Sequence, residues 1–148
     1  MRFDRKKLAA EGIRKALRIR QAVGITICDP LNIFDFVESQ RVEVWFGNVA
    51  SLEGMYSKDP GPMILLSSER PPGRQAFTCA HEFGHHVFDH GTQIDQYIDG
   101  QNRERPNEFL ADCFAGALLM PPTAVRRAFV DRGWEIRNPT PTQFYIEI

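Results

Sequence analysis

The sequence lacks the features of an exported or membrane-bound protein. Its three cysteines, Cys28, Cys79 and Cys113, include no CxxC pair, and an odd count does not suit a secreted disulfide framework. We therefore expect three reduced, buried thiols. No apolar run approaches the ~20 residues of a membrane helix, and no apolar signal-peptide core follows the basic N-terminus. These absences favour a cytoplasmic protein that does not associate with a membrane.

The composition also lacks repeats, low-complexity tracts and a large net charge. The chain has 148 residues with a formal net charge of −1, and its 43% apolar content is ordinary for one globular domain. Charge is uneven, because the first 22 residues hold most of the excess positive charge. The basic residues of this segment are Arg2, Arg5, Lys6, Lys7, Arg14, Lys15, Arg18 and Arg20. A single basic helix face is usually only solvated, so we do not expect direct DNA binding.

The hydrophobic periodicity predicts an α+β domain. Asp4 is a candidate N-cap for a basic helix over residues 4–22, and Asp29-Pro30 predicts a second helix over 30–39. Short alternating or apolar runs between residues 41 and 67 predict a small three-stranded sheet, an antiparallel meander or a mixed sheet, packed against helices. The expected strands are 41–46, 53–57 and 63–67, and the expected later helices are 74–89, 106–120 and 123–132.

The domain organisation follows from the same pattern. Residues 1–132 are expected to form the functional domain, with a polar loop over 91–105 between the two long later helices. A proline-rich stretch then begins a segment, residues 133–148, that we interpret as a linker and the start of a C-terminal element, which we expect to be truncated.

The strongest functional signal is an HExxH motif on the helix predicted for residues 74–89. His81 and His85 are four residues apart, so both imidazoles lie on one helix face and can bind one metal ion. Glu82 lies about 100° round the helix from His81. Its carboxylate can therefore reach a water molecule beside the metal without being a ligand, as a general base must.

A catalytic zinc site needs a third protein ligand, and the sequence offers two candidates. His90 follows His85 by five residues, which does not fit the extended motif in which a glycine and a third histidine follow at three and six residues. Glu108 lies on the next long helix, four residues before Asp112, so the two carboxylates share a face. Glu108 can bind the metal while Asp112 accepts a hydrogen bond from a ligand imidazole and fixes its tautomer.

Two segments resemble the ImmA/IrrE metallopeptidases. RQAFTCAHEFGHH at residues 74–86 is similar to the family motif R-x-x-F-T-x-A-H-E-x-G-H. EFLADCFAGALLMP at residues 108–121 resembles the second motif, E-x-x-A-N-x-F-A-x-x-L-L-M-P, with Asp112 in place of the usual Asn. The resemblance covers about residues 40–132.

This resemblance implies a thermolysin-like minimal zincin fold of the gluzincin type. It also implies a cytoplasmic zinc endopeptidase whose protein substrate is a helix-turn-helix transcriptional repressor, cleaved in a stress response or during mobile-element induction. The implied site contains His81, His85 and Glu108 as metal ligands, Glu82 as the catalytic base and Asp112 behind the ligands.

Other residues are candidate contacts to the substrate or the oxyanion, because this charge needs donors besides the metal. We expect an edge strand near residues 53–58 to hold the substrate in extended form. His86 is expected to be packed or on the surface, and Arg74 to pair with an acidic residue near the site. The candidate contacts are Tyr56, Tyr97, His90, Arg103 and Arg105.

Two other functions remain compatible with the sequence. The chain could be a zinc-containing regulatory module that binds a repressor or another partner without cleaving it. It could also be a DNA-binding protein with structural zinc, although that needs a fourth ligand and a wider basic surface. Imidazole and carboxylate ligands suit Zn²⁺, Mn²⁺ and other divalent metals. The sequence does not define the oligomeric state.

Overall fold

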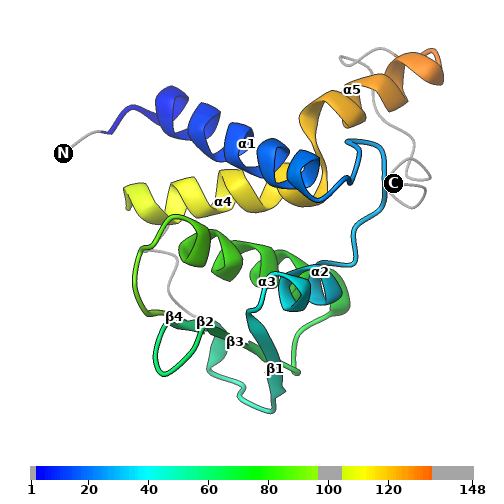
Figure 1. Ribbon diagram of the computed structural model, residues 1–148. Coiled ribbons are helices and arrows are strands. Elements are labelled where there is room, and N and C mark those ends of the chain that lie inside the picture. The colour runs from blue at the N-terminus through cyan, green and yellow to red at the C-terminus, as the bar shows by residue number, and fades with distance from the viewer. Residues whose placement is uncertain (1–2, 97–104, 135–148) are drawn as a thin grey trace.

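The described chain, residues 3–96 and 105–134 of a computed structural model, folds into helices that all lie on one side of a small sheet (Figure 1). This arrangement confirms the predicted α+β class. The helices are α1 (Arg5–Ala22), α2 (Ile33–Ser39), α3 (Pro72–Val87), α4 (Pro106–Leu119) and α5 (Pro122–Asp131). The strands are β1 (Glu43–Gly47), β2 (Leu52–Ser57), β3 (Met63–Ser67) and β4 (Gln93–Gln96).

The helix starts follow local capping chemistry. The Asp4 side chain accepts a hydrogen bond from Lys7 N at 3.1 Å and caps α1, as predicted. The predicted cap of the second helix was wrong, because Asn32 caps α2 instead. The Asp29 carboxylate is used in a turn, where it accepts a hydrogen bond from Thr26 N at 2.7 Å, so α2 begins three residues later than expected.

The sheet order β1-β3-β2-β4 confirms the mixed-sheet alternative and corrects three other expectations. The strands do not form a meander, because β1 pairs in parallel with β3, while β2 runs antiparallel to both β3 and β4. The sheet has a fourth strand in the segment that the sequence predicted as loop. This strand joins through backbone pairing with β2, and its largely polar sequence has no apolar alternation that would reveal it. The segment 53–58 is therefore not an edge, since β2 is paired on both sides.

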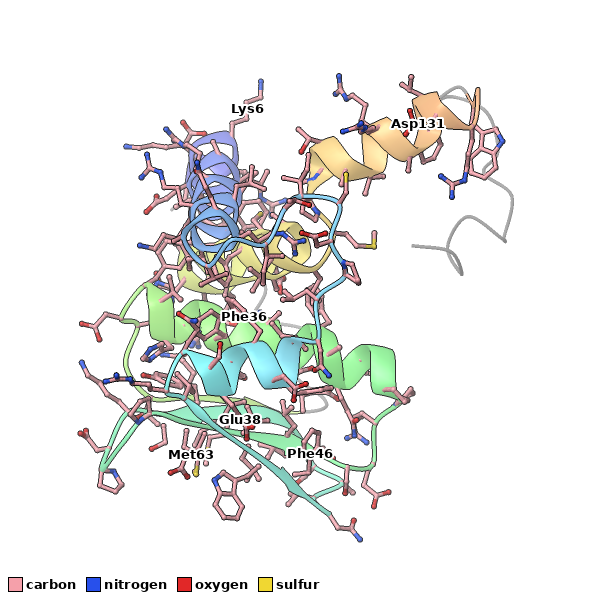
Figure 2. All side chains as sticks on the ribbon, turned by 45° about the vertical axis from the view of Figure 1, so that its right-hand side comes forward. Lys6, Phe36, Glu38, Phe46, Met63 and Asp131 are labelled. Carbon is pink, nitrogen blue, oxygen red and sulfur yellow. The ribbon has the colours of Figure 1, made fainter. Side chains whose placement is uncertain are left out.

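Figures 1 and 2 show three layers. The sheet lies at one end, α3 and α2 cover it, and α1 and α4 lie side by side beyond α3. Helix α5 extends away from these layers, and none of its residues is buried. The α3 helix thus lies between the sheet and α4, and residues 78–85, polar side chains included, are all buried.

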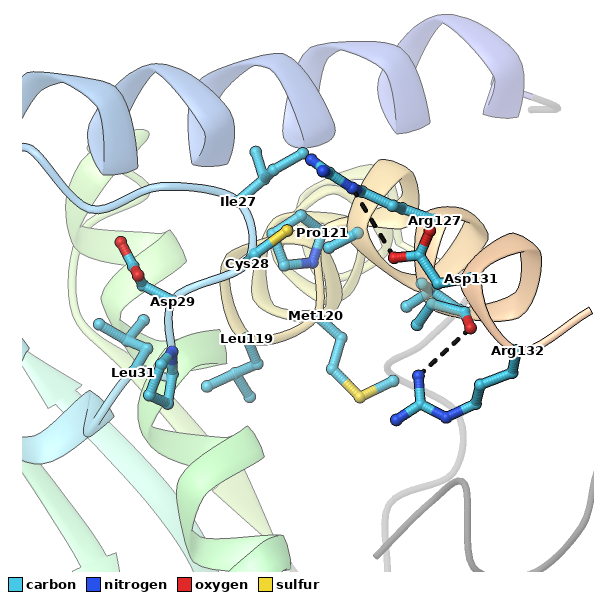
Figure 3. Close-up of a pocket in the computed structure, with 14 residues that line it drawn as sticks. Ile27, Cys28, Asp29, Leu31, Leu119, Met120, Pro121, Arg127, Asp131 and Arg132 are labelled. Carbon is cyan, nitrogen blue, oxygen red and sulfur yellow. Dashed lines mark hydrogen bonds and ion pairs between the residues drawn. The ribbon is translucent and has the colours of Figure 1, made fainter. Parts of the chain in front are cut away.

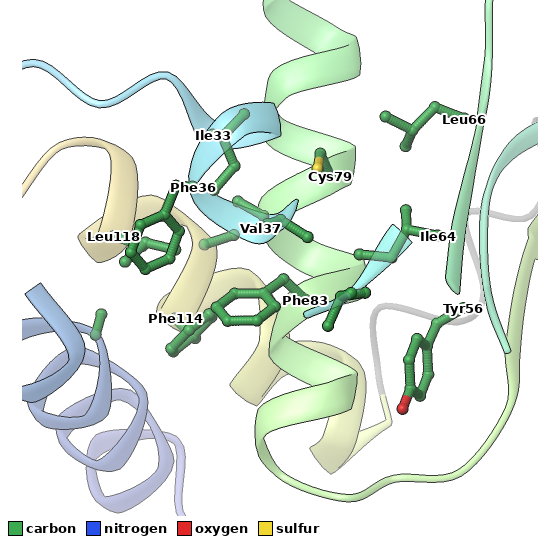
Figure 4. Packing of buried hydrophobic residues seen from close by; sticks show 14 of the residues in the cluster. Ile33, Phe36, Val37, Tyr56, Ile64, Leu66, Cys79, Phe83, Phe114 and Leu118 are labelled. Carbon is green, nitrogen blue, oxygen red and sulfur yellow. The ribbon is translucent and has the colours of Figure 1, made fainter. Parts of the chain in front are cut away.

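The core centres on aromatic rings between α2, α3 and α4 (Figure 4). Phe83 contacts both Phe36 and Phe114, with ring centroids 5.7 and 6.0 Å apart. Gly84 lets α3 approach α4 closely, since a Cβ there would lie 3.0 Å from Phe114 Cδ1. A larger residue at this position would therefore push α3 and α4 apart.

The basic face of α1 is smaller than its sequence suggested. Lys6 and most of its basic neighbours are exposed, and Figure 2 shows Lys6 pointing away from the molecule. Arg20, however, is only 1% exposed. Its guanidinium donates to the carbonyl oxygens of Leu118, Thr26 and Asp29 at 2.6–2.7 Å, so it ties α1 to the end of α4 and to the following loop.

The structure also tests two further expectations, that the three thiols are reduced and buried and that no helix spans a membrane. All three thiols are free, but only Cys79 is fully buried, and the prediction of burial is wrong for Cys28, which is exposed. Burial, with the nearby charges of Glu82 and Glu38, raises the pKa of Cys79 to about 12, so this thiol remains protonated. Within residues 3–96 and 105–134, no helix is both long and apolar enough to cross a bilayer.

Candidate metal centre

The side chains of His81, His85 and Glu108 converge between α3 and α4. The Nε2 atoms of the two histidines are 3.0 Å apart, and His81 Nε2 lies 3.1 Å from Glu108 Oε2. His85 Nε2 lies 3.4 Å from the other oxygen of Glu108. All three side chains are buried, so three ligand-type atoms from two helices enclose one small space.

The spacing of these atoms fits a metal ion. Zinc bonds of about 2.0–2.1 Å in tetrahedral geometry separate neighbouring ligand atoms by about 3.3 Å. The observed separations of 3.0 to 3.4 Å are close to that value. Two imidazoles and one carboxylate also leave one tetrahedral position open, as in catalytic rather than structural sites. The residues present therefore fit a catalytic divalent metal.

The electrostatics keep Glu108 in its ligand form. Burial raises the pKa of its carboxyl, but hydrogen bonds and positive charge from His81 and His85 outweigh burial and lower the pKa to about 2. Glu108 is therefore a carboxylate at neutral pH, which is the form that binds metal.

Asp112 lies behind His81, one helical turn after Glu108. Its Oδ1 is 2.9 Å from His81 Nδ1, on the side of the ring opposite the three converging atoms. A carboxylate in this position accepts, so if His81 offers Nε2 to a metal its ring proton would lie on Nδ1 and be donated to Asp112. The structure thus brings together the four residues that the two sequence motifs placed on separate helices.

Glu82 occupies the interface between α3 and the sheet, where it is fully buried. Strand β2 passes directly against it at Gly54, where a Cβ would lie 3.1 Å from Glu82 Oε1 and 2.5 Å from Thr78 Cγ2. The sequence analysis missed Gly54. Its signal was available, because a glycine within a strand often marks a close approach of another element.

The ring of His90 contacts His85 from outside the set formed by His81, His85 and Glu108. The two Nδ1 atoms are 2.9 Å apart, and the His90 ring stacks on Phe88. Burial lowers the pKa of His90, and the charge of His85 lowers it further. His90 is therefore adjacent to the site, but among the described residues it is not part of the three-residue metal set.

The remaining predicted contacts lie in different places. The Tyr56 hydroxyl is buried and lies 2.8 Å from His86 Nδ1, so it is already engaged away from the three converging atoms. Burial lowers the pKa of His86, which favours a neutral ring that can accept this hydrogen bond. Arg105 is exposed at the N-cap of α4, while Tyr97 and Arg103 lie outside the described residues.

Arg74 pairs with an acidic residue, as predicted. Its Nε lies 2.8 Å from Glu53 Oε2 on β2, and Arg70 Nε lies 2.8 Å from the other oxygen of the same carboxylate. Arg70 also donates to the Ala50 carbonyl. These contacts attach the start of α3 to β2 and so support the strand against which Glu82 packs.

A pocket lies elsewhere on the molecule. A pocket of about 480 Å³ separates the α1–α2 connection from α4 and α5, and Arg127 pairs with Asp131 on its wall (Figure 3). It contains none of the residues of the metal set. The pocket is lined by residues such as Cys28, Leu31 and Met120.

The fold and the site together define an α+β domain with a buried His–His–Glu metal set on two neighbouring helices, in which the buried Glu82 directly follows the first of the two histidines. The comparison with known families is consistent with that class, because the peptidase family described as the IrrE N-terminal-like domain matches residues 45–145. The chain belongs to this ImmA/IrrE family. The match excludes α1 and α2 and extends beyond residue 132.

One curated relative is the radiation response metalloprotease IrrE of Deinococcus radiodurans. It is 38% identical over 63 residues, which is 40% of this chain. The matched segment spans only 19% of the length of that relative. The similarity therefore concerns one part of a much longer protein.

Proposed function

We propose that the protein is a zinc-dependent endopeptidase. The observation that carries the proposal is the convergence of His81, His85 and Glu108 within 4.8 Å of one another, next to the buried carboxylate of Glu82. Family membership and the metalloprotease name of the relative support the same chemistry.

The two histidines and Glu108 would hold the ion, with Asp112 orienting His81. A bound zinc would supply Lewis acidity that polarises the scissile carbonyl and activates water. Zinc is proposed because of the His–His–Glu set and its open position, although Mn²⁺ or another divalent ion suits the same ligands.

Glu82 would act as the general base. It follows His81 directly, so its carboxylate lies on a different side of α3 from the two imidazoles. It would take a proton from the attacking water and deliver it to the leaving amine. Strand β2 passes close to this carboxylate at Gly54, so any side chain at position 54 would press on Glu82.

The peptide substrate would bind in extended form along β4. Strand β2 cannot accept it, since β3 and β4 occupy both of its edges. In the described chain, β4 is an outer strand. It pairs with Gly54, the residue that contacts Glu82, so of the two outer strands β4 is the one nearer to that contact. The outer edge of β4 therefore replaces the segment 53–58 in the substrate-binding proposal.

The proposed substrate is a cytoplasmic helix-turn-helix repressor cleaved in a stress response. The family resemblance carries this part of the proposal, as does the relative's role in a radiation response, which its name states. In the same proposal, residues 1–132 form the catalytic domain and direct DNA binding plays no part. The exposed basic residues of α1 lie on a single helix, which is too narrow to form a broad nucleic-acid surface.

The test is co-expression with the helix-turn-helix regulator encoded beside the protein. The wild type and Glu82→Gln are each expressed with the tagged regulator, and the regulator is followed on a gel. We expect cleavage with wild type and an intact regulator with Glu82→Gln. An intact regulator that is co-purified equally by both proteins would instead establish the non-cleaving binding module.

A further inference from the structure

His90 is not part of the metal set, yet its contact with His85 is as short as the contact between Asp112 and His81. The Nδ1 atom of the buried His85 lies 2.9 Å from the Nδ1 atom of the half-buried His90. Two ring nitrogens at that separation need one donor and one acceptor. The proton arrangement is therefore decided by what each ring does with its other nitrogen.

The Nε2 atom of His85 faces His81 and Glu108. If this nitrogen offers its lone pair to a metal, the single proton of the neutral ring must sit on Nδ1. Nδ1 then donates, and His90 Nδ1 must accept. We propose that His90 is a positioning residue, which accepts a hydrogen bond from His85 and so fixes the ring and tautomer of this metal ligand. The inference rests on the proposed metal site.

The local backbone explains why a residue five positions later can reach His85. Helix α3 ends in a Schellman motif, in which Asp89 N donates to the His86 carbonyl at 3.2 Å and His90 N donates to the His85 carbonyl at 3.0 Å. Asp89 has φ of 53°, a left-handed conformation that Asp tolerates better than most residues. This turn brings the chain back over the last helical turn, so residue 90 lies beside residue 85.

Further contacts hold His90 in place from both sides. Its ring stacks on Phe88 with centroids 5.8 Å apart and planes inclined by 17°. Its carbonyl accepts a hydrogen bond from Gln93 Nε2 at 2.9 Å, at the start of β4. The Asp89 carboxylate pairs with Lys58 at 2.7 Å, but both side chains are more than half exposed, so this pair contributes little.

The two metal-ligand histidines thus receive support from different elements. Asp112 on α4 fixes His81, and the turn after α3 fixes His85 through His90. A neutral imidazole replaces the usual carboxylate or carbonyl behind the second histidine. Because His90 leads directly into β4, the same turn connects the metal ligand to the strand proposed for substrate binding.

The test compares two nearly isosteric substitutions, His90→Asn and His90→Leu, by zinc affinity in competition with a chromogenic chelator. Both remove the ring and its stacking on Phe88, but only Asn keeps an acceptor at the δ position. We expect His90→Leu to weaken zinc binding by about 10–100-fold, and His90→Asn to restore most of the loss. His86→Leu changes the adjacent histidine, which contacts Tyr56 and not the metal set, and should leave zinc affinity unchanged.

A further variant separates the effect of the turn after α3 from the effect of the Asp89 carboxylate. Asp89→Gly keeps the left-handed conformation and should bind zinc as the wild type does. Equal zinc affinities for His90→Asn and His90→Leu would overturn the proposal, whether both match wild type or both lose binding. A wild type that binds no zinc would refute the proposed metal site itself, so the two failures are distinguishable. Thermal melting of each variant identifies loss of fold.

Discussion

Gly54→Ala tests whether the contact between β2 and α3 controls both stability and the position of Glu82. The new Cβ would lie 2.5 Å from Thr78 Cγ2, whereas two carbon atoms pack favourably at about 3.5–4.0 Å. A shift of about 1 Å is therefore needed. Thr78 cannot supply it easily, because its branched side chain is stiff at χ1 and 8% exposed.

We expect Gly54→Ala to lower the free energy of unfolding by about 1–3 kcal/mol, as overpacked cores do. The reduced entropy of the unfolded chain returns at most about 1 kcal/mol. The control is Gly116→Ala in α4, where a Cβ meets nothing within 4 Å. There the same substitution should stabilise the protein by about 0.5–1 kcal/mol. Urea unfolding of both variants measures the difference.

A second substitution identifies the cause. Thr78→Ser removes the clashing methyl, so in the Gly54→Ala background it should recover stability instead of reducing it. Activity should recover less, because the new Cβ still lies 3.1 Å from Glu82 Oε1 and 3.2 Å from Glu82 Cγ. A Gly54→Ala protein with wild-type stability and activity, or a Thr78→Ser change that is simply additive, would refute the reasoning.

Three more substitutions have defined outcomes. Glu82→Gln should keep zinc content and melting temperature but lose cleavage by at least about 10²–10⁴-fold, because Gln cannot accept the proton; an active variant in a cleavage assay would contradict the mechanism. Asp112→Ala should fold and bind zinc about 10–100-fold more weakly by chelator competition, since His81 loses its acceptor; unchanged affinity would reduce Asp112 to a packing role. Arg20→Met should cost about 2–4 kcal/mol in urea unfolding, because the Leu118 carbonyl and two loop carbonyls lose a charged donor; a change below about 0.5 kcal/mol, typical of surface sites, would show that these bonds contribute little.

The helices were predictable because their signals are local. The apolar periodicity of α3 and α4 defined both helices within two residues. The predicted start of α3 at residue 74 was late, because Pro72 lies in the first turn of the helix and does not precede it. Strand pairing was not predictable, since parallel pairing of β1 with β3 depends on contacts between separate segments. Strand β4 escaped notice because a short, mostly polar strand carries no apolar alternation.

The metal set was predictable because helical spacing alone places His81 and His85 on one face. The partner carboxylates followed from the four-residue spacing of Glu108 and Asp112. The contact between His90 and His85 could not be predicted in this way. It depends on Asp89 adopting a left-handed conformation, which the presence of an aspartate does not by itself determine. The burial of Arg20 was likewise hidden, because its three acceptors are backbone carbonyls.

Metal analysis of purified protein tests the central claim most directly, because every proposed step requires His81, His85 and Glu108 to form one site. Inductively coupled plasma mass spectrometry should find about one zinc per wild-type chain, and none after His81→Ala, His85→Ala or Glu108→Ala, each with its fold checked by circular dichroism. Full zinc occupancy in Glu108→Ala, together with complete loss in His90→Ala, would contradict the assigned ligand set.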